Sequence, residues 1–274
     1  MSAASFAAAQ LIRVLPRARI SGLMGRLSEA QLPDVVSRVV MGTYARAYRV
    51  DLDEALPTPS AYPSFDAFFT RALRDGARRV SDAPVVSPAD GQLSALGRVN
   101  EGGRIHAKGQ SYALGDLVGA PADAERYHNG SFFVVYLSPR DYHRVHSPVA
   151  GHVSLVRGIP GDLYPVNSIG ERYVPGLFVR NNRVAICIDT EQLGRVTVVM
   201  VGAMIVGRIS VSVLPDPAVP PGVHTIDPKV EVSRGDEIGI FHLGSTAVVL
   251  LEPGVTISRP VGPVRYGEAL TGAT

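Results

Sequence analysis

Short runs of apolar, largely β-branched and aromatic residues constrain the fold of this chain more than any other feature. They lie at 132–137, 184–188, 196–201 and 247–251, and clusters of glycine, proline and other turn residues separate them. Runs of this length between turn signals are typical of strands. From about residue 77 onward the sequence therefore predicts a β-rich core, which we expect to consist mostly of antiparallel sheets.

The first part of the chain has a helical period instead. Ile20, Leu23, Met24 and Leu27 have the i, i+3, i+4, i+7 spacing that places side chains on one helix face. A second apolar stripe recurs at every fourth residue, at Val36, Val40, Tyr44 and Tyr48. Arg17, Arg19 and Arg26 lie elsewhere around the first helix. Such a basic amphipathic helix fits a membrane interface, and the alternative is a helix that packs on the protein's own core.

A further helix is expected after Ser64, because serine is a favoured N-cap residue. Phe65, Phe68, Phe69 and Leu73 would share one face of it, and Gly76 would end it. We therefore expect an α+β protein with N-terminal amphipathic helices, divided into a helical region of residues 1–76 and a β-rich domain of residues 77–274.

Composition excludes several classes of protein. A net charge of +2 is too small for a nucleic-acid-binding surface unless the basic residues are concentrated in one place, and here they gather near the amino end. The single cysteine, Cys187, excludes an intramolecular disulfide and a multi-thiolate metal site, and its apolar neighbours predict a core position.

Membrane and targeting segments are also constrained by the sequence. The longest apolar run, residues 196–207, is shorter than the roughly 18 residues that a spanning helix needs, so we expect a buried strand there. Residues 1–28 contain arginines and no acid, and no basic residue precedes the alanine-rich start. A secretory signal is therefore not expected, whereas a mitochondrial-type presequence remains an alternative.

Three polar clusters interrupt this apolar sequence and carry the residues that chemistry requires. They are Ser87-Pro-Ala-Asp90-Gly91, Asp141-Tyr-His143-Arg144-Val-His146-Ser-Pro148, and Leu243-Gly244-Ser245-Thr246. Together they supply a carboxylate, imidazoles and a hydroxyl, which are the groups that activate a serine. No serine lies in a Gly-x-Ser-x-Gly motif, and no His-Glu-x-x-His motif is present, so we expect neither an α/β-type hydrolase nor a metal site.

These clusters, in this order, resemble the phosphatidylserine decarboxylase family of pyruvoyl enzymes. Further similarity covers nearly the whole chain, at Tyr48-Arg-Val-Asp51, Phe68-Phe-Thr-Arg71, Ala107-Lys-Gly109, Pro160-Gly-Asp-Leu163 with Val166-Asn167, and Val201-Gly-Ala203. One departure is Asn182, where the family usually has glutamate.

The resemblance implies a self-processing enzyme. Cleavage between Gly244 and Ser245 would leave a large chain of residues 1–244 and a small chain of residues 245–274, with Ser245 converted to a covalently bound pyruvoyl group that accepts electrons during decarboxylation. An Asp90–His146 pair would activate the Ser245 hydroxyl. His143 would protonate the substrate carbon, and Arg144 would meet the lipid phosphate unless it pairs with a local acid.

The resemblance also implies partners and location. The substrate would be phosphatidylserine at an anionic membrane surface, where basic residues are attracted by about 1 kcal/mol each. We expect a peripheral protein on the cytoplasmic face of the cell membrane, or alternatively at the mitochondrial inner membrane, with no metal, no nucleic acid, and possible pairing of processed chains into a homodimer.

Three other functions compete with this interpretation. Arg234–Gly239 is similar to a hairpin of biotinyl and lipoyl carriers, but the nearest lysine is Lys229 and the Leu243–Thr246 turn has none. A pyruvoyl decarboxylase of a soluble amino acid and an unprocessed scaffold are the others.

Overall fold

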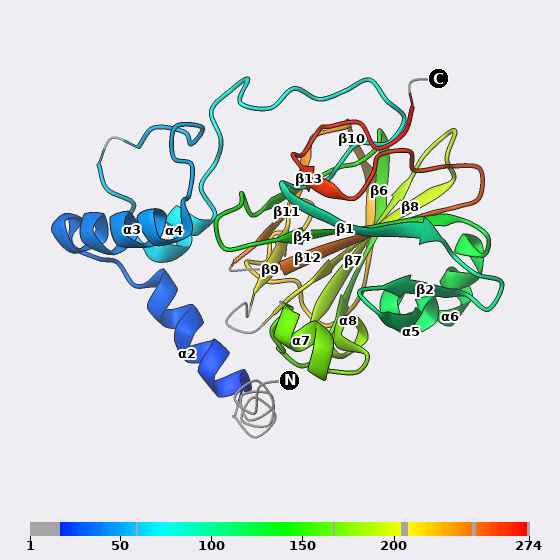
Figure 1. Ribbon diagram of the computed structural model, residues 1–274, viewed down its shortest axis with the longest axis horizontal. Helices are drawn as coiled ribbons and strands as arrows, with labels where there is room; N and C mark the ends of the chain where they lie inside the picture. The colour runs from blue at the N-terminus through cyan, green and yellow to red at the C-terminus, as the bar shows by residue number, and fades with distance from the viewer. Residues whose placement is uncertain (1–16, 59, 167, 204–207, 243–244, 273–274) are drawn as a thin grey trace.

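The computed structural model describes residues 17–58, 60–166, 168–203, 208–242 and 245–272. Its centre is an eight-stranded sheet with the order β10-β6-β7-β8-β12-β4-β1-β13, in which every neighbouring pair is antiparallel (Figure 1). The strands of this sheet are β1 (Gly91–Arg98), β4 (Ser131–Leu137), β6 (Gly151–Ile159), β7 (Arg183–Asp189), β8 (Arg195–Val201), β10 (Gly222–Val232), β12 (Ser245–Leu251) and β13 (Gly262–Val264).

Smaller elements cover the two faces of this sheet. A three-stranded sheet has the order β5-β11-β9, and β2 pairs with β3 in a separate hairpin. The remaining strands and core helices are β2 (Arg104–Ala107), β3 (Gln110–Ala113), β5 (Arg144–His146), β9 (Ile209–Val211), β11 (Glu237–Phe241), α5 (Leu114–Val118), α6 (Pro121–Ala124), η1 (Glu125–Tyr127), α7 (Ser168–Tyr173) and α8 (Leu177–Arg180).

Alternation along the central strands builds two hydrophobic clusters. In β12, Val249 belongs to a cluster that includes Ile238 and Phe241 of β11, whereas Val248 belongs to a second cluster that includes Leu117 of α5. Successive strand residues point to opposite faces, and here both faces are covered. Apolar side chains are therefore needed at consecutive positions, which explains the continuous apolar runs in the sequence.

The predicted α+β architecture with an antiparallel β-rich core is confirmed. The runs expected as strands lie within β4, β7, β8 and β12. Cys187 is a buried residue of β7 and accepts a hydrogen bond from Thr197 in β8 at 3.4 Å, so its expected core position is also confirmed. No helix among the described residues is long and apolar enough to cross a membrane.

The N-terminal helices lie to one side of the sheet (Figure 1). They are α2 (Arg17–Glu29) and α3 (Asp34–Tyr48), followed by the short α4 (Phe65–Phe69). The Tyr44 side chain packs against Phe65 and Phe68 and donates a hydrogen bond to the Pro139 carbonyl at 3.1 Å. Ser37 donates to the Tyr62 carbonyl at 2.6 Å. These contacts attach α3 to α4 and to the core, while other faces of α2 and α3 remain exposed.

The helix expected after Ser64 is shorter than the sequence indicates. Ser64 caps it as predicted, accepting a hydrogen bond from the Ala67 amide at 3.1 Å. The helix ends at Phe69, however, and Leu73 lies outside it in a bridge to Ala55. The prediction of a shared face that reaches Leu73 is therefore wrong, because the backbone there bonds to residues 54–56 instead of to the preceding turn.

Candidate active site

Ser245 is the first residue of β12 and is fully buried in the middle of the large sheet. It pairs with Leu137 at the end of β4, and its hydroxyl oxygen has no hydrogen-bond partner among the described residues. A buried hydroxyl without a partner costs free energy, so such groups are uncommon outside functional sites. Gly244, the other residue of the predicted cleavage bond, lies outside the described residues.

His146 ends β5 and is held from three sides. Its Nδ1 lies 2.7 Å from the Gly235 carbonyl, its Nε2 lies 3.2 Å from the Tyr142 hydroxyl, and the Tyr266 ring stacks on the imidazole with centroids 3.8 Å apart. A carbonyl can only accept, so Nδ1 carries the proton and Nε2 accepts from Tyr142. Burial lowers the pKa of His146, which keeps the imidazole neutral.

Asp90 is buried at the start of β1, where Arg78 binds both of its carboxylate oxygens. The Tyr266 amide donates to the same carboxylate at 2.9 Å. No direct hydrogen bond joins Asp90 to His146 among the described contacts. Tyr266 links the two residues instead, because its backbone holds Asp90 while its ring covers His146.

His143 is completely buried in the loop before β5. Its Nδ1 lies 2.8 Å from the Asp141 carbonyl, its ring packs against Phe69 at 4.0 Å, and its Nε2 has no hydrogen-bond partner among the described residues. Burial, with a smaller effect of the Arg71 charge, lowers the pKa of His143 to about 3. The neutral ring thus donates from Nδ1 and presents an unprotonated Nε2.

The structure connects His143 to the segment before Ser245. The Phe241 amide donates to the His143 carbonyl at 3.0 Å, and Phe241 ends β11, which leads toward Ser245. From the other direction, the strand partner of Ser245 is Leu137, after which the Asp141 carboxylate closes a turn by accepting from the Ser138 amide at 2.7 Å. The second and third polar clusters therefore meet in space.

Arg144 has protein partners of its own. Its Nη1 lies 2.8 Å from the Glu237 carboxylate, and its Nε donates to the Thr70 carbonyl at 2.8 Å. The sequence left open whether Arg144 meets a lipid phosphate or a local acid, and in the structure it meets the acid. Because Arg144 is paired with Glu237, its guanidinium has a counterion even when no ligand is bound.

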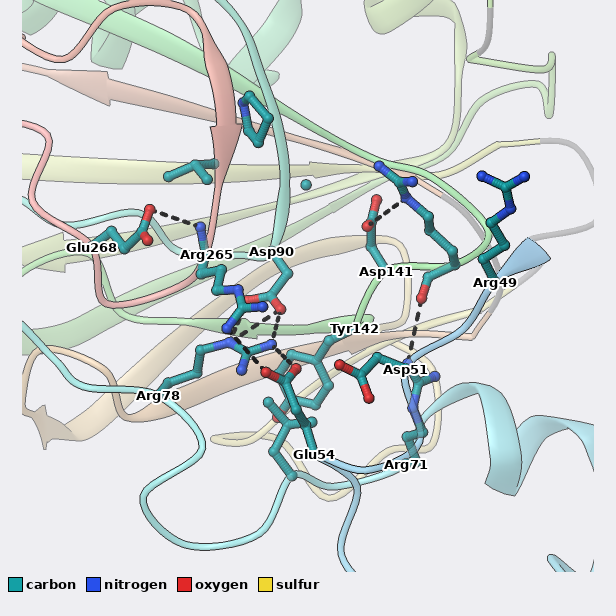
Figure 2. A pocket seen from close by; sticks show the side chains of 15 residues that line it. Arg49, Asp51, Glu54, Arg71, Arg78, Asp90, Asp141, Tyr142, Arg265 and Glu268 are labelled. Carbon is teal, nitrogen blue, oxygen red and sulfur yellow. Dashed lines mark hydrogen bonds and ion pairs between the residues drawn. The ribbon is translucent and has the colours of Figure 1, made fainter. Parts of the chain in front are cut away.

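A cleft of about 350 Å³ opens beside these residues and is lined by Asp90 and Tyr142 among others (Figure 2). On one side of it Arg78 binds Asp90 and Glu54, and Arg265 binds Glu54 at 3.0 Å. On the other side Figure 2 shows Arg49 and Arg71, and Arg140 also lines the cleft. Most of the acids in the cleft are thus already neutralised by arginines.

Several residues of this site had no assigned role in the sequence. Tyr142 and Arg71 lie in quoted motifs, which were a usable signal, whereas Arg78 and Tyr266 lie in unremarkable segments. The Arg234–Gly239 segment forms a turn in which Gly235 has a φ of 84°, and a Cβ there would collide with Val80. A glycine is required at this position, and its carbonyl holds His146.

Two buried polar atoms of this site are left without a hydrogen-bond partner in the part of the chain that the structure describes. Among the described residues, no cluster of His, Cys, Asp and Glu is arranged to hold a metal. The Ser245 hydroxyl and the His143 Nε2, in contrast, are both buried and both lack a partner.

Comparisons with known proteins give consistent matches over most of the chain. Residues 65–272 match the family model described as phosphatidylserine decarboxylase. The chain is 41% identical over 277 residues to the phosphatidylserine decarboxylase proenzyme of Bordetella pertussis, covering 93% of this chain and 90% of that protein. It is 42% identical over 243 residues to the protein of the same name from Acinetobacter baylyi, covering 87% of this chain and 84% of that protein.

Proposed function

Since this chain belongs to the phosphatidylserine decarboxylase family, and is thus a carboxy-lyase, we propose that it cleaves itself between Gly244 and Ser245 and converts Ser245 into a pyruvoyl group. With that group it decarboxylates phosphatidylserine to phosphatidylethanolamine. The observation that best supports this proposal is the fully buried Ser245 hydroxyl without a hydrogen-bond partner, at the head of a central strand.

Maturation begins when the Ser245 oxygen attacks the Gly244 carbonyl. His146 is the base in this step, because its Nε2 is unprotonated and its orientation is set by Gly235 and Tyr266. The charges of Glu237 and then Asp90 favour the imidazolium through space, and Arg78 holds the Asp90 carboxylate in place. The peptide nitrogen leaves as an amine and an ester forms; β-elimination then releases the Gly244 carboxylate, and water displaces ammonia to leave the ketone.

Decarboxylation requires a proton at two stages. The pyruvoyl carbonyl supplies an electron sink for the bond that breaks. His143 Nε2 is an acceptor in the resting state, so it first takes a proton from the substrate ammonium. It then returns this proton to the carbon from which carbon dioxide leaves. This order reconciles the expected role of His143 as a proton donor with its neutral, buried ring.

The N-terminal helices form the membrane-docking face of this proposal. Most of the large hydrophobic side chains with high exposure lie between residues 23 and 56, among them Leu23 and Leu27 of α2 and Val35 and Val39 of α3. The Ile20 side chain, part of the expected stripe, lies outside the described side chains. Arg26, Arg38 and Arg46 provide positive charge on the same helices, which suits an anionic bilayer. The exposed apolar faces of α2 and α3 therefore support a peripheral position at a membrane as the proposed location.

A trapping experiment tests the proposed reaction. The purified protein is incubated with vesicles that contain phosphatidylserine, and a borohydride reagent is then added. We expect phosphatidylethanolamine to form and a lipid adduct to appear on the small chain alone, because only that chain carries the ketone. An adduct on a lysine of the large chain would contradict the pyruvoyl assignment. Turnover of free serine without vesicle binding would favour an enzyme for soluble amino acids.

A further inference from the structure

We propose that Arg71 binds the phosphodiester of the substrate head group in the cleft beside the candidate active site. This inference rests on the proposed function and deepens it, since it names the group that anchors the lipid. It also assigns phosphate binding to Arg71 instead of Arg144, whose guanidinium already pairs with Glu237. The ligand chemistry is a phosphate oxyanion that approaches from the cleft.

Arg71 is a buried cation without a counterion. It is 5% exposed, and no carboxylate among the described residues lies within ion-pair distance of its guanidinium. Its Nε has no hydrogen-bond partner, and its Nη2 reaches only the Arg140 carbonyl, at 3.5 Å. A buried charge without a partner is costly, and burial accordingly lowers the pKa of Arg71. An anion in the cleft would remove this cost.

Most of the other arginines of the cleft are already paired with carboxylates. Arg78 and Arg265 are already paired with Asp90 and Glu54. Arg49, at the rim, has no carboxylate within ion-pair distance among the described residues, like Arg71. Figure 2 shows Arg49 and Arg71 on the same side of the cleft, away from the paired network. Arg49 and Arg71 thus supply the unpaired positive charge of this side of the cleft, against one carboxylate without an ion pair among the described residues, Asp51.

Arg71 is also close to the groups that react. It follows Phe69, whose ring lies 4.0 Å from that of His143, and its charge contributes to the lowered pKa of His143. The same cleft is lined by Tyr142, which contacts His146. A phosphate on Arg71 would therefore place the amino end of the head group, only a few bonds away, toward His143.

The anchored group is the phosphate and not the carboxylate of the substrate. The carboxylate loses its negative charge as carbon dioxide departs, so a guanidinium on it would stabilise the ground state more than the transition state. The phosphodiester is unchanged by the reaction, so a guanidinium that binds it stabilises the ground state and the transition state equally. Arg49 ends α3, whose exposed valines form the proposed docking face, so the cleft opens where bilayer phosphates lie.

Binding of glycerophosphoethanolamine tests this inference, because this soluble product head group has the phosphodiester but neither carboxylate nor acyl chains. Calorimetry with the self-cleaved wild-type protein is compared with Arg71→Gln, Arg71→Lys and the control Arg74→Gln, an exposed arginine of the same segment. We expect Arg71→Gln to weaken binding about tenfold to a hundredfold, as for loss of a charge-assisted contact, and to raise KM for dihexanoyl-phosphatidylserine more than it lowers kcat. Arg74→Gln should bind like the wild type.

Several outcomes would overturn the inference. In the first, Arg71→Gln binds glycerophosphoethanolamine as tightly as the wild type. In the second, Arg71→Gln loses affinity only for ligands that carry a carboxylate. In the third, inorganic phosphate binds the wild type as tightly as glycerophosphoethanolamine does, which would indicate a site for free phosphate. If Arg71→Gln fails to fold or to cleave itself, Arg71→Lys becomes the deciding variant. Because lysine lacks the planar guanidinium, Arg71→Lys should bind glycerophosphoethanolamine more weakly than the wild type. Wild-type affinity of Arg71→Lys would contradict the inference. If binding depends on Arg71 but the protein does not decarboxylate phosphatidylserine, the proposed function is contradicted and the role of Arg71 in phosphodiester binding is not.

Discussion

Two histidines that lie close together in the chain have different surroundings, and the difference supports the separate roles proposed for them. His146 is held through both ring nitrogens and by a stacked tyrosine, next to a carboxylate that acts on it through space. His143 is held through Nδ1 alone and keeps Nε2 free. The first arrangement suits a base with a fixed orientation, and the second suits a group that passes a proton to and from a ligand.

Substitution of each histidine should separate maturation from turnover. His146→Gln should slow self-cleavage about a hundredfold to ten-thousandfold, the usual contribution of a positioned base, and leave mostly uncut chain. His143→Gln should still cleave but lose decarboxylation by a similar factor. Denaturing gels with mass spectrometry measure the first effect, and phosphatidylethanolamine formation measures the second. Identical behaviour of both variants would contradict the division of roles.

Burial of neutral His143 also predicts how stability depends on pH. Its pKa is lowered from 6.5 to about 3, so between these values the unfolded chain binds a proton that the folded chain does not. The contribution of this residue to stability is therefore complete above pH 6.5 and is lost as pH falls toward 3, by at most about 1.4 kcal/mol per pH unit.

Denaturant unfolding of the uncut Ser245→Ala chain at several pH values measures this effect. Adding His143→Gln should flatten the loss of stability on the acid side, whereas the control His152→Gln, at an exposed histidine, should leave it unchanged. If the His143 variant kept the full pH slope, the ring would not be buried in its neutral form.

At this scale the sequence could nominate candidate residues for the chemistry, but it could not predict their contacts. The motifs identified Asp90, His143, His146 and Ser245 as candidates, and the structure gathers His143 and Ser245 through Phe241 and Leu137. It did not predict that Arg78 and Tyr266 hold Asp90. Tyr266 is far from Asp90 in the chain, and only the pairing of β13 with β1 brings the two segments together.

Among the elements, the strands were easier to predict than the helix ends. A strand covered on both faces must be apolar throughout, so β4, β7, β8 and β12 are visible in the sequence. The end of α4 could not be predicted from the sequence, because it depends on backbone hydrogen bonds between residues 72–74 and residues 54–56, which are tertiary contacts. The exposed faces of α2 and α3 show a related limit, since periodicity cannot distinguish a core-facing stripe from a membrane-facing one.

The proposed docking role of α3 leads to a binding prediction. Val35 and Val39 are 72% and 63% exposed, and burial of each in a bilayer contributes on the order of 1 kcal/mol. Val35→Asp with Val39→Asp should weaken binding to phosphatidylserine vesicles about tenfold or more in a flotation assay. The matched control is Val223→Asp in β10, at a valine that is 59% exposed. Equal effects at both places would remove the docking face from the account.

At the scale of the whole molecule, the proposed cleavage would divide the chain without dividing the fold. β12 lies between β8 and β4, and all of its residues are buried. Beyond it, β13 pairs with β1, and the Leu270 amide donates to the Val85 carbonyl at 3.0 Å. The small chain would thus contribute a central strand, an edge strand and a terminal segment to a structure made mostly by the large chain.

The two chains should therefore remain together after cleavage. We expect residues 1–244 and 245–274 to coelute in size-exclusion chromatography at the volume of the uncut Ser245→Ala protein, and to separate only in denaturant. The elution volume also tests the predicted homodimer. Loss of the small chain during purification in native buffer would show that β12 is not held as its hydrogen bonds indicate.

Intact mass spectrometry of the purified protein tests the central claim most directly. The account predicts two masses, a large chain that ends in the Gly244 carboxylate and a small chain that begins at position 245 and is lighter, by one ammonia, than the same peptide with an amino-terminal serine. Ser245→Ala should give one uncut mass. An active preparation whose small chain retains an ordinary serine, or whose chain is uncut, would contradict the account.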